Sequence, residues 1–74
     1  LQQRFQKLTE REQDVFRLSA KGFTSKEIGE QLIISPKTVD TYRQRAFEKL
    51  GIEHRSELIR LALNLGILDD LKEN

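Results

Sequence analysis

Apolar side chains recur along this chain at three- and four-residue spacings, and no stretch shows the strict alternation of a half-buried strand. This periodicity predicts an all-α protein. Thr9 and Thr24 each precede a glutamate by three residues, as in a capping box, and Ser35 stands before Pro36 as a cap stands before a first helical residue. We therefore predict a compact four-helix bundle with helices over about 9–21, 24–31, 36–50 and 55–65.

The two middle helices of this prediction are joined by a turn of three residues, 32–34. A helix, a turn of three or four residues and a second, steeply angled helix make up a helix-turn-helix unit. Gly29 supports this interpretation, because a glycine inside a helix costs about 1 kcal/mol relative to alanine and usually has a packing reason. We expect Gly29 to let the third helix cross closely over the second. On this pattern alone, other helical bundles remain open.

Length and composition limit what the chain is able to do. Its 74 residues make one small domain or a piece of a longer protein, which we divide into the end of a linker or helix (1–7), a domain (8–68) and a C-terminal tail (69–74). The 13 Lys and Arg nearly balance the 12 Asp and Glu, so nucleic-acid binding has to be argued from geometry and not from net charge. The absence of cysteine excludes disulfides and thiolate metal sites and fits a reducing cytoplasm.

The sequence argues against an enzyme and against a membrane protein. Its apolar runs are far shorter than the roughly 20 residues of a membrane span. It has no grouping of Ser, His and Asp, no glycine-rich phosphate loop and no metal-ligand spacing. His54, the single histidine, is interpreted as a helix cap or a solvated side chain. We therefore predict no catalytic residue, no metal and no cofactor.

Five blocks of sequence, taken together and in order, resemble the LuxR-type helix-turn-helix domain, the DNA-binding output domain of GerE-, NarL- and FixJ-like regulators. The blocks are 8–12 (LTERE), 22–28 (GFTSKEI), 35–39 (SPKTV), 49–51 (KLG) and 55–58 (RSEL). The resemblance implies sequence-specific binding of double-stranded DNA in transcription regulation, with the third helix in the major groove. It also implies the effector domain of a two-component response regulator, whose receiver or sensor domain lies outside this chain.

The outward residues near the start of the third helix are the candidates for reading bases, since such a helix enters the groove by that end. The base-reading positions of the family correspond to Asp40, Thr41 and Gln44, and Arg43 and Arg45 lie beside them. Gln suits adenine, Arg suits guanine, a Thr methyl meets a thymine methyl, and an acid accepts only from cytosine. The role of Asp40 stays open, because phosphates repel a carboxylate: it either contacts a base or forms a salt bridge to Arg43 that orients a reader.

Phosphate contacts are expected from the rims of the second and third helices, where free N–H groups and the positive end of the helix dipole attract anions. The candidates are Thr24, Ser25, Lys26, Lys37, Thr38, Tyr42 and Lys49. Two alternatives remain: the threonines satisfy only local backbone groups, or Lys49 pairs with an acid from another helix. Tyr42 is expected in the core, with its hydroxyl toward a phosphate.

Glu12, Glu27 and Arg55 lie within the family's recurring blocks and are interpreted as structural. A partly buried acid–base pair between helices would fix the angle at which they cross. Isolated surface pairs contribute only about 0–1 kcal/mol.

The fourth helix carries more apolar residues than one buried face requires, with Leu61 and Leu63 at opposite edges of its apolar side. An exposed apolar flank commonly marks a protein contact. We predict a weak two-fold homodimer that reads repeated half-sites about one helical turn apart. Its contact residues are Glu57, Arg60, Leu61 and Asn64. The alternative is a helix covered all round by the linker and the tail.

The predicted partners are double-stranded DNA, a second copy of the chain, the covalently attached sensor or receiver domain, and RNA polymerase as a further candidate. We expect a bacterial cytoplasmic protein without membrane contact. The alternative function is a helical protein-interaction module that keeps this fold without DNA contacts. Only Asp40 and the modest net charge favour that alternative.

Overall fold

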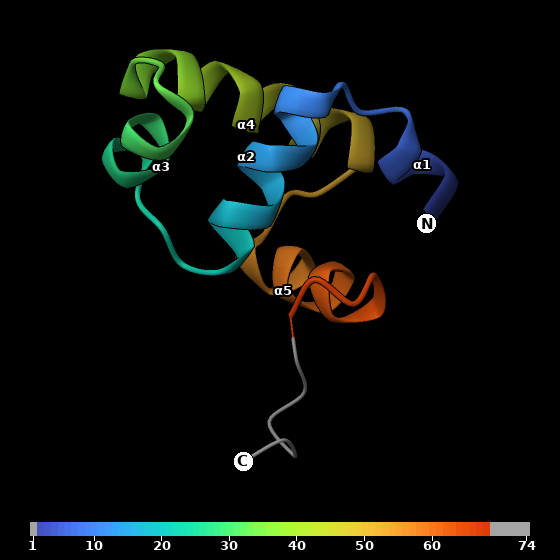
Figure 1. The fold of residues 1–74 in the computed structure, drawn as a ribbon. Helices are drawn as coiled ribbons and strands as arrows, with labels where there is room; N and C mark the ends of the chain where they lie inside the picture. The colour runs from blue at the N-terminus through green and yellow to red at the C-terminus, as the bar shows by residue number, and fades with distance from the viewer. Residues whose placement is uncertain (1, 69–74) are drawn as a thin grey trace.

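A computed structural model describes residues 2–68, with side chains from Arg4 onward. This part of the chain contains helices and no strands, so the all-α prediction is confirmed. The helices are α1 (Gln2–Gln6), α2 (Glu10–Ala20), α3 (Ser25–Leu32), α4 (Pro36–Leu50) and α5 (Arg55–Asn64). The longest helix, α4, packs against α1, α2 and α3, while α5 packs against α2 at the other side of the molecule (Figure 1). Within residues 2–68, no helix has both the length and the apolar character that crossing a bilayer requires.

Local capping determines where three of these helices begin. The Thr9 hydroxyl accepts a hydrogen bond from the Glu12 N–H at 3.2 Å, and the Glu12 carboxylate accepts one from the Thr9 N–H at 2.9 Å. Thr24 and Glu27 repeat this capping box at 3.1 and 2.8 Å. Ser35 caps α4 by accepting from the Thr38 N–H at 3.1 Å. The predicted starts of these three helices are confirmed.

The segment before the first capping box is a helix and part of the packed domain. Phe5 of α1 is only 8% exposed and meets Phe16 edge to face, with ring centroids 5.6 Å apart. The Arg17 guanidinium lies 5.3 Å from the centre of the Phe5 ring. Of the two interpretations of this segment, linker end or helix, residues 2–6 form a helix, and its Phe5 is buried. The predicted tail, 69–74, lies outside the described residues.

Two clusters of buried residues hold the helices together. The larger one joins α1, α2, α5 and the second half of α4: Phe5, Leu8, Phe16, Ala20, Ala46, Leu50, Leu58, Leu61 and Ala62. The smaller one joins α2 and α3 to the first half of α4 through Val15, Ile28 and Val39. The helix-turn-helix unit of α3 and α4 therefore has a small core of its own.

The turn between α3 and α4 depends on a glycine. A Cβ at Gly29 would lie 2.5 Å from the carbonyl oxygen of Ile34 and 3.4 Å from the nitrogen of Pro36. The close approach is thus to the turn that enters α4, and not to the body of α4 as the sequence suggested. Ile33 ends α3 in the left-handed conformation (φ 59°, ψ 50°) with 89% of its surface exposed, an unusual position for a β-branched residue.

Replacing Gly29 with alanine tests this contact. In an ordinary helix interior the change would stabilise the protein by about 1 kcal/mol. Here we expect Gly29→Ala to lower the free energy of unfolding by about 2 kcal/mol or more, because the new methyl group meets backbone atoms that cannot rotate away. Urea denaturation measures the difference, with the exposed neighbour Glu30→Ala as control. A Gly29→Ala protein as stable as the wild type would show that the turn does not depend on the close contact between position 29 and the Ile34 carbonyl oxygen.

Candidate nucleic-acid interface

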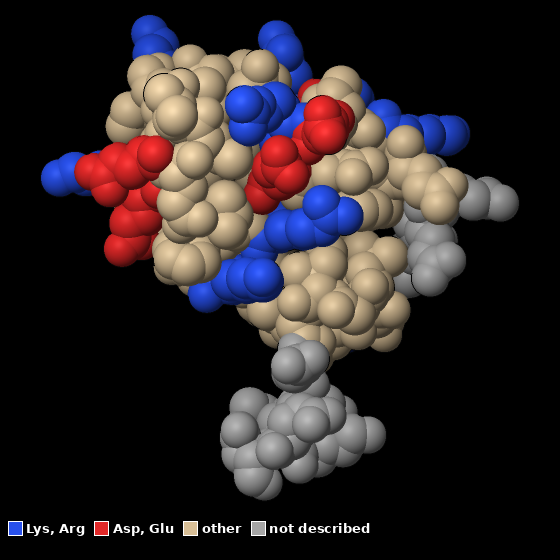
Figure 2. All heavy atoms as spheres, in the orientation of Figure 1, with Lys and Arg blue, Asp and Glu red and all other residues tan. Residues whose placement is uncertain are grey.

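The outer face of α4 is a row of exposed polar side chains. On the opposite face Val39 and Ala46 are fully buried and Leu50 is 4% exposed, which fixes how the helix is turned. The exposed row consists of Lys37, Asp40, Thr41, Gln44, Arg45 and Glu48. Lys and Arg side chains project from the upper edge of the molecule in Figure 2, along which α4 runs in Figure 1. The predicted base readers other than Arg43 all belong to this row.

The starts of α3 and α4 present similar groups beside the row. Lys26 and Lys37 each stand second in their helix, and both side chains are exposed near the positive end of the helix dipole. The hydroxyl of Thr38 is within 2.9 Å of that of Ser35, so it takes part in capping. Thr24 is exposed and also serves as a cap. Thr24 therefore has the local backbone role that the sequence left open, whereas the Thr38 hydroxyl contacts the Ser35 hydroxyl.

Asp40 and Arg43 form an ion pair that reaches two other helices. One carboxylate oxygen of Asp40, Oδ1, accepts a hydrogen bond from the Ser25 hydroxyl of α3 at 2.5 Å and another from Nη1 of Arg43 at 3.3 Å. Nε of Arg43 donates to the buried hydroxyl of Ser19 in α2 at 3.1 Å. Arg43 is therefore drawn toward α2 and away from the exposed row. Asp40 forms the salt bridge that the sequence offered as one of its two roles.

Ser19 is the residue of this network that the sequence analysis did not single out. It is 5% exposed and lies on the buried side of α2. A hydroxyl between apolar neighbours in such a run needs a partner, because an unpaired buried polar group is costly. The position of Ser19 within an apolar run could therefore have indicated a hydrogen-bonded hydroxyl, but it does not indicate which residue is the partner.

Lys49 and Glu12 form the acid–base pair between helices. Nζ of Lys49 in α4 lies 2.8 Å from Oε1 of Glu12 in α2, whose side chain is only 3% exposed. Burial opposes the charged carboxylate, but the hydrogen bonds from Lys49 and Thr9 outweigh it, so the pKa of Glu12 lies below its ordinary value. The predicted structural role of Glu12 is confirmed, and the alternative raised for Lys49 is the one observed.

The remaining structural candidates sit at helix ends. Glu27 closes the capping box of α3, and Arg55 is exposed at the first position of α5. His54 is the N-cap residue of α5, but its side chain makes no capping hydrogen bond. The Glu57 carboxylate does this instead, accepting from the N–H groups of Glu53 at 2.7 Å and His54 at 3.0 Å, which lowers the Glu57 pKa.

The four predicted dimer residues line one hollow of about 180 Å³ between the end of α4 and α5. These four residues are Glu57, Arg60, Leu61 and Asn64. The other residues that line the hollow are Leu50, Gly51 and Ile52. Leu61 is only 6% exposed and belongs to the larger cluster, so the expectation of an exposed apolar flank at Leu61 is wrong. The exposed apolar residue of α5 is Leu63, at 43%. A helical wheel gives the faces of α5 but not which face its neighbours cover.

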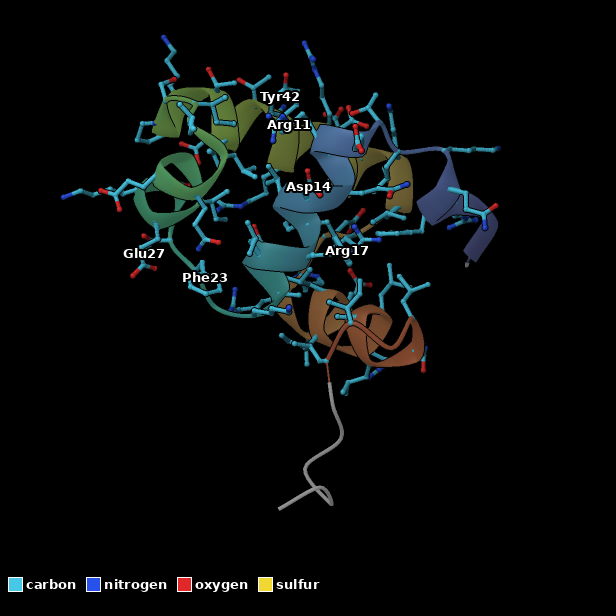
Figure 3. The ribbon with its side chains drawn as sticks, viewed as in Figure 1. Arg11, Asp14, Arg17, Phe23, Glu27 and Tyr42 are labelled. Carbon is cyan, nitrogen blue, oxygen red and sulfur yellow. The ribbon has the colours of Figure 1, made fainter. Side chains whose placement is uncertain are left out.

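Other surfaces differ in character from the row on α4. Arg11, Asp14 and Arg17 follow one another along α2 and are labelled in Figure 3, with the Asp14 carboxylate 3.8 and 3.9 Å from the two guanidinium groups. Tyr42 is half-buried and packs against the smaller core cluster. Residues 2–68 contain no group of three or more His, Cys, Asp or Glu arranged to hold a metal ion.

Comparison with known proteins identifies the helix-turn-helix unit. Residues 6–62 match the family model for bacterial regulatory proteins of the luxR family. The chain belongs to this family. It is 46% identical over 63 residues to the response regulator UvrY of Escherichia coli K12, and 38% identical over 65 residues to the oxygen regulatory protein NreC of Staphylococcus carnosus. These alignments cover 85% and 88% of this chain but only 29% and 30% of the relatives.

A solved structure agrees with this assignment. A crystal structure of full-length FixJ from B. japonicum superposes with a TM-score of 0.81 at 34% identity, over 90% of this chain and 33% of that one. The chain thus spans about a third of the length of the proteins it matches. Family membership implies DNA binding in transcription regulation as the role of this domain.

The pH dependence of stability tests the Glu12–Lys49 pair. Because the folded-state pKa of Glu12 lies below the ordinary value of 4.5, its ionised form stabilises the protein above that pH, and this stabilisation is lost as the pH falls through the folded-state pKa. We expect Glu12→Gln to lower the free energy of unfolding by about 1–3 kcal/mol at neutral pH. The difference from wild type should shrink as the pH falls below 4.5 and through the folded-state pKa.

Urea denaturation at several pH values measures this difference. The exposed Glu10→Gln, which removes the same charge two residues away in α2, serves as control and should change the free energy of unfolding by less than about 0.5 kcal/mol. A Glu12→Gln deficit that stays constant or grows in acid would contradict the paired, ionised carboxylate.

Proposed function

We propose that the chain is the sequence-specific, double-stranded-DNA-binding effector domain of a two-component response regulator, with α4 lying in the major groove. The observation that carries the proposal is the exposed row on α4, together with the lysines at the starts of α3 and α4. A helix of this kind enters the groove by its N-terminal end, while the preceding helix crosses the backbone. The named relative UvrY is itself a response regulator, which supports the assignment to that class.

Base readout is assigned to the first three turns of α4. Gln44 is exposed and suits adenine, and Arg45 suits guanine. The Thr41 hydroxyl donates to the carbonyl oxygen of Lys37 at 3.2 Å, which leaves its methyl group for contact with a thymine methyl. Arg43 acts through Asp40 and Ser19, because its guanidinium is hydrogen-bonded to both. We therefore assign Arg43 a positioning role and not direct readout.

Phosphate contacts are assigned to the helix starts, chiefly to Lys26 and Lys37, with Thr24, Ser25 and Thr38 offering hydroxyl or N–H groups beside them. Tyr42 is half-buried, so only its hydroxyl is assigned to a phosphate. Lys49 contributes least, since its amine is 2.8 Å from Glu12. These contacts fix the position of α4 and carry no sequence information by themselves.

We further propose that two copies meet through the hollow between α4 and α5, so that the DNA site consists of repeated half-sites. Its rim is polar, with Glu57, Arg60 and Asn64 around the nearly buried Leu61.

A second arginine at Asn64, beside Arg60, would bring like charges together across a two-fold axis. Sedimentation equilibrium should show Asn64→Arg as a weaker dimer than wild type or the exposed-site control Gln31→Arg. A wild-type chain that stays monomeric both free and on DNA would contradict this interface.

The proposed partners beyond DNA are a receiver domain on the same polypeptide and RNA polymerase. Both follow from the response-regulator class, as does a location in the bacterial cytoplasm.

Salt dependence of DNA affinity tests the phosphate contacts. Each neutralised phosphate adds about 0.9 to the slope of log affinity against log salt concentration, because condensed counterions are released. We expect the chain to bind mixed-sequence duplex DNA with an affinity that falls steeply with salt. Lys26→Ala and Lys37→Ala should each reduce that slope by about 1.

The matched control is Lys21→Ala, which removes the same charge from the C-terminal end of α2, beside the end of α5. Its slope should equal that of the wild type. Fluorescence anisotropy with a labelled duplex measures all four proteins. Folded wild-type protein that fails to bind duplex DNA even at low salt would contradict the proposed function, and equal slopes in all four would contradict the assigned lysines.

A further inference from the structure

The carboxylate of Asp40 is held by one oxygen and free at the other. Oδ1 accepts both hydrogen bonds, from Ser25 at 2.5 Å and from Arg43 at 3.3 Å. Among the residues that the structure describes, none hydrogen-bonds to Oδ2. The Asp40 side chain is 60% exposed and belongs to the outer row of α4, just after its first turn. One acceptor oxygen is thus presented to solvent in a fixed direction.

The donors that hold Oδ1 are themselves fixed. Arg43 is anchored by its Nε bond to Ser19, which is 5% exposed, and Ser25 is the first residue of α3. Hydrogen bonds therefore fix the carboxylate to α3 directly, through Ser25, and to α2 indirectly, through Arg43 and Ser19. A group that is already oriented loses little further side-chain entropy when it binds a ligand.

Arg43 also removes the main objection to an acid on this face. DNA phosphates repel an unpaired carboxylate. The Arg43 guanidinium lies 3.3 Å from the Asp40 carboxylate, so at longer range its positive charge cancels the negative charge of Asp40. The pair approaches the groove as a neutral dipole. What remains is the short-range property of Oδ2, which accepts a hydrogen bond and cannot donate one.

We propose that Asp40 reads a cytosine through Oδ2, an inference that rests on the proposed function. In the major groove cytosine presents the N4 amino group as a donor. Guanine and thymine present acceptor oxygens at the equivalent edge, which repel a carboxylate, and the amino group of adenine lies beside the acceptor N7. Asp40 therefore selects cytosine and rejects the other three bases, while Ser25 and Arg43 act as positioning residues.

Selection of binding sites from a pool of randomised duplex DNA tests this assignment. Wild-type protein is compared with Asp40→Asn, which keeps the shape of the side chain but gives it a donor as well as an acceptor. Asparagine pairs with N6 and N7 of adenine. We expect one position of the selected motif to change from cytosine to adenine, with a preference of about five- to tenfold in each case.

The matched control is Asp14→Asn. Asp14 also pairs with an arginine three residues away, but it lies on α2, where Figure 3 shows it between Arg11 and Arg17. Its selected motif should be the wild-type motif. Thermal melting of all three proteins shows whether a change in motif has any origin in unfolding.

Each other outcome overturns the inference. An Asp40→Asn motif identical to the wild type, or tighter binding to every sequence without a change of base, would show that Asp40 does not read DNA and would leave the proposed function standing. A cytosine position that persists in Asp40→Asn would assign cytosine to another residue. No enrichment of any duplex by folded wild-type protein would overturn the proposed function together with this inference.

Discussion

The arrangement of the helix-turn-helix unit depends on the missing side chain at Gly29. Only without a Cβ does α3 come close enough to the Ile34 carbonyl oxygen for the chain to turn back within a few residues and enter α4. This contact sets the angle between the two helices, and the small cluster of Val15, Ile28 and Val39 packs within that angle. The start of α3 consequently lies beside Asp40 of α4, to which Ser25 donates a hydrogen bond.

The same helix that holds the core together also carries the polar row, and this restricts which of its charges face outward. Of the four cations of α4, Arg43 is bonded to Asp40 and Ser19, and Lys49 to the buried Glu12. Lys37 and Arg45 are exposed and form no ion pair with the described residues. Little of the positive charge of α4 is therefore free for phosphates, so base contacts have to supply a larger share of the binding free energy.

The sequence was sufficient where structure is decided locally. The capping boxes at Thr9 and Thr24 span three residues each, and both are observed as predicted. The sequence did not predict which residues distant in the chain pair with one another. Arg43 bonds to Ser19, 24 positions away, and Lys49 bonds to Glu12, 37 positions away. A helical period gives the polar face of α4 directly, because its two faces differ in character. It does not give the covered side of α5, whose apolar residues surround most of the helix, nor the packing of the short helix α1.

The central claim is that α4 and the start of α3 form the surface that meets DNA, and mapping that surface residue by residue tests it most directly. We would record amide chemical shifts of the isotope-labelled chain while adding duplex DNA at low salt. The account predicts that the largest changes fall on Lys26 and its neighbours and on the first three turns of α4, from Lys37 to Arg45. Changes concentrated on α5 or on the Arg11–Asp14–Arg17 face of α2, with α4 unaffected, would contradict it.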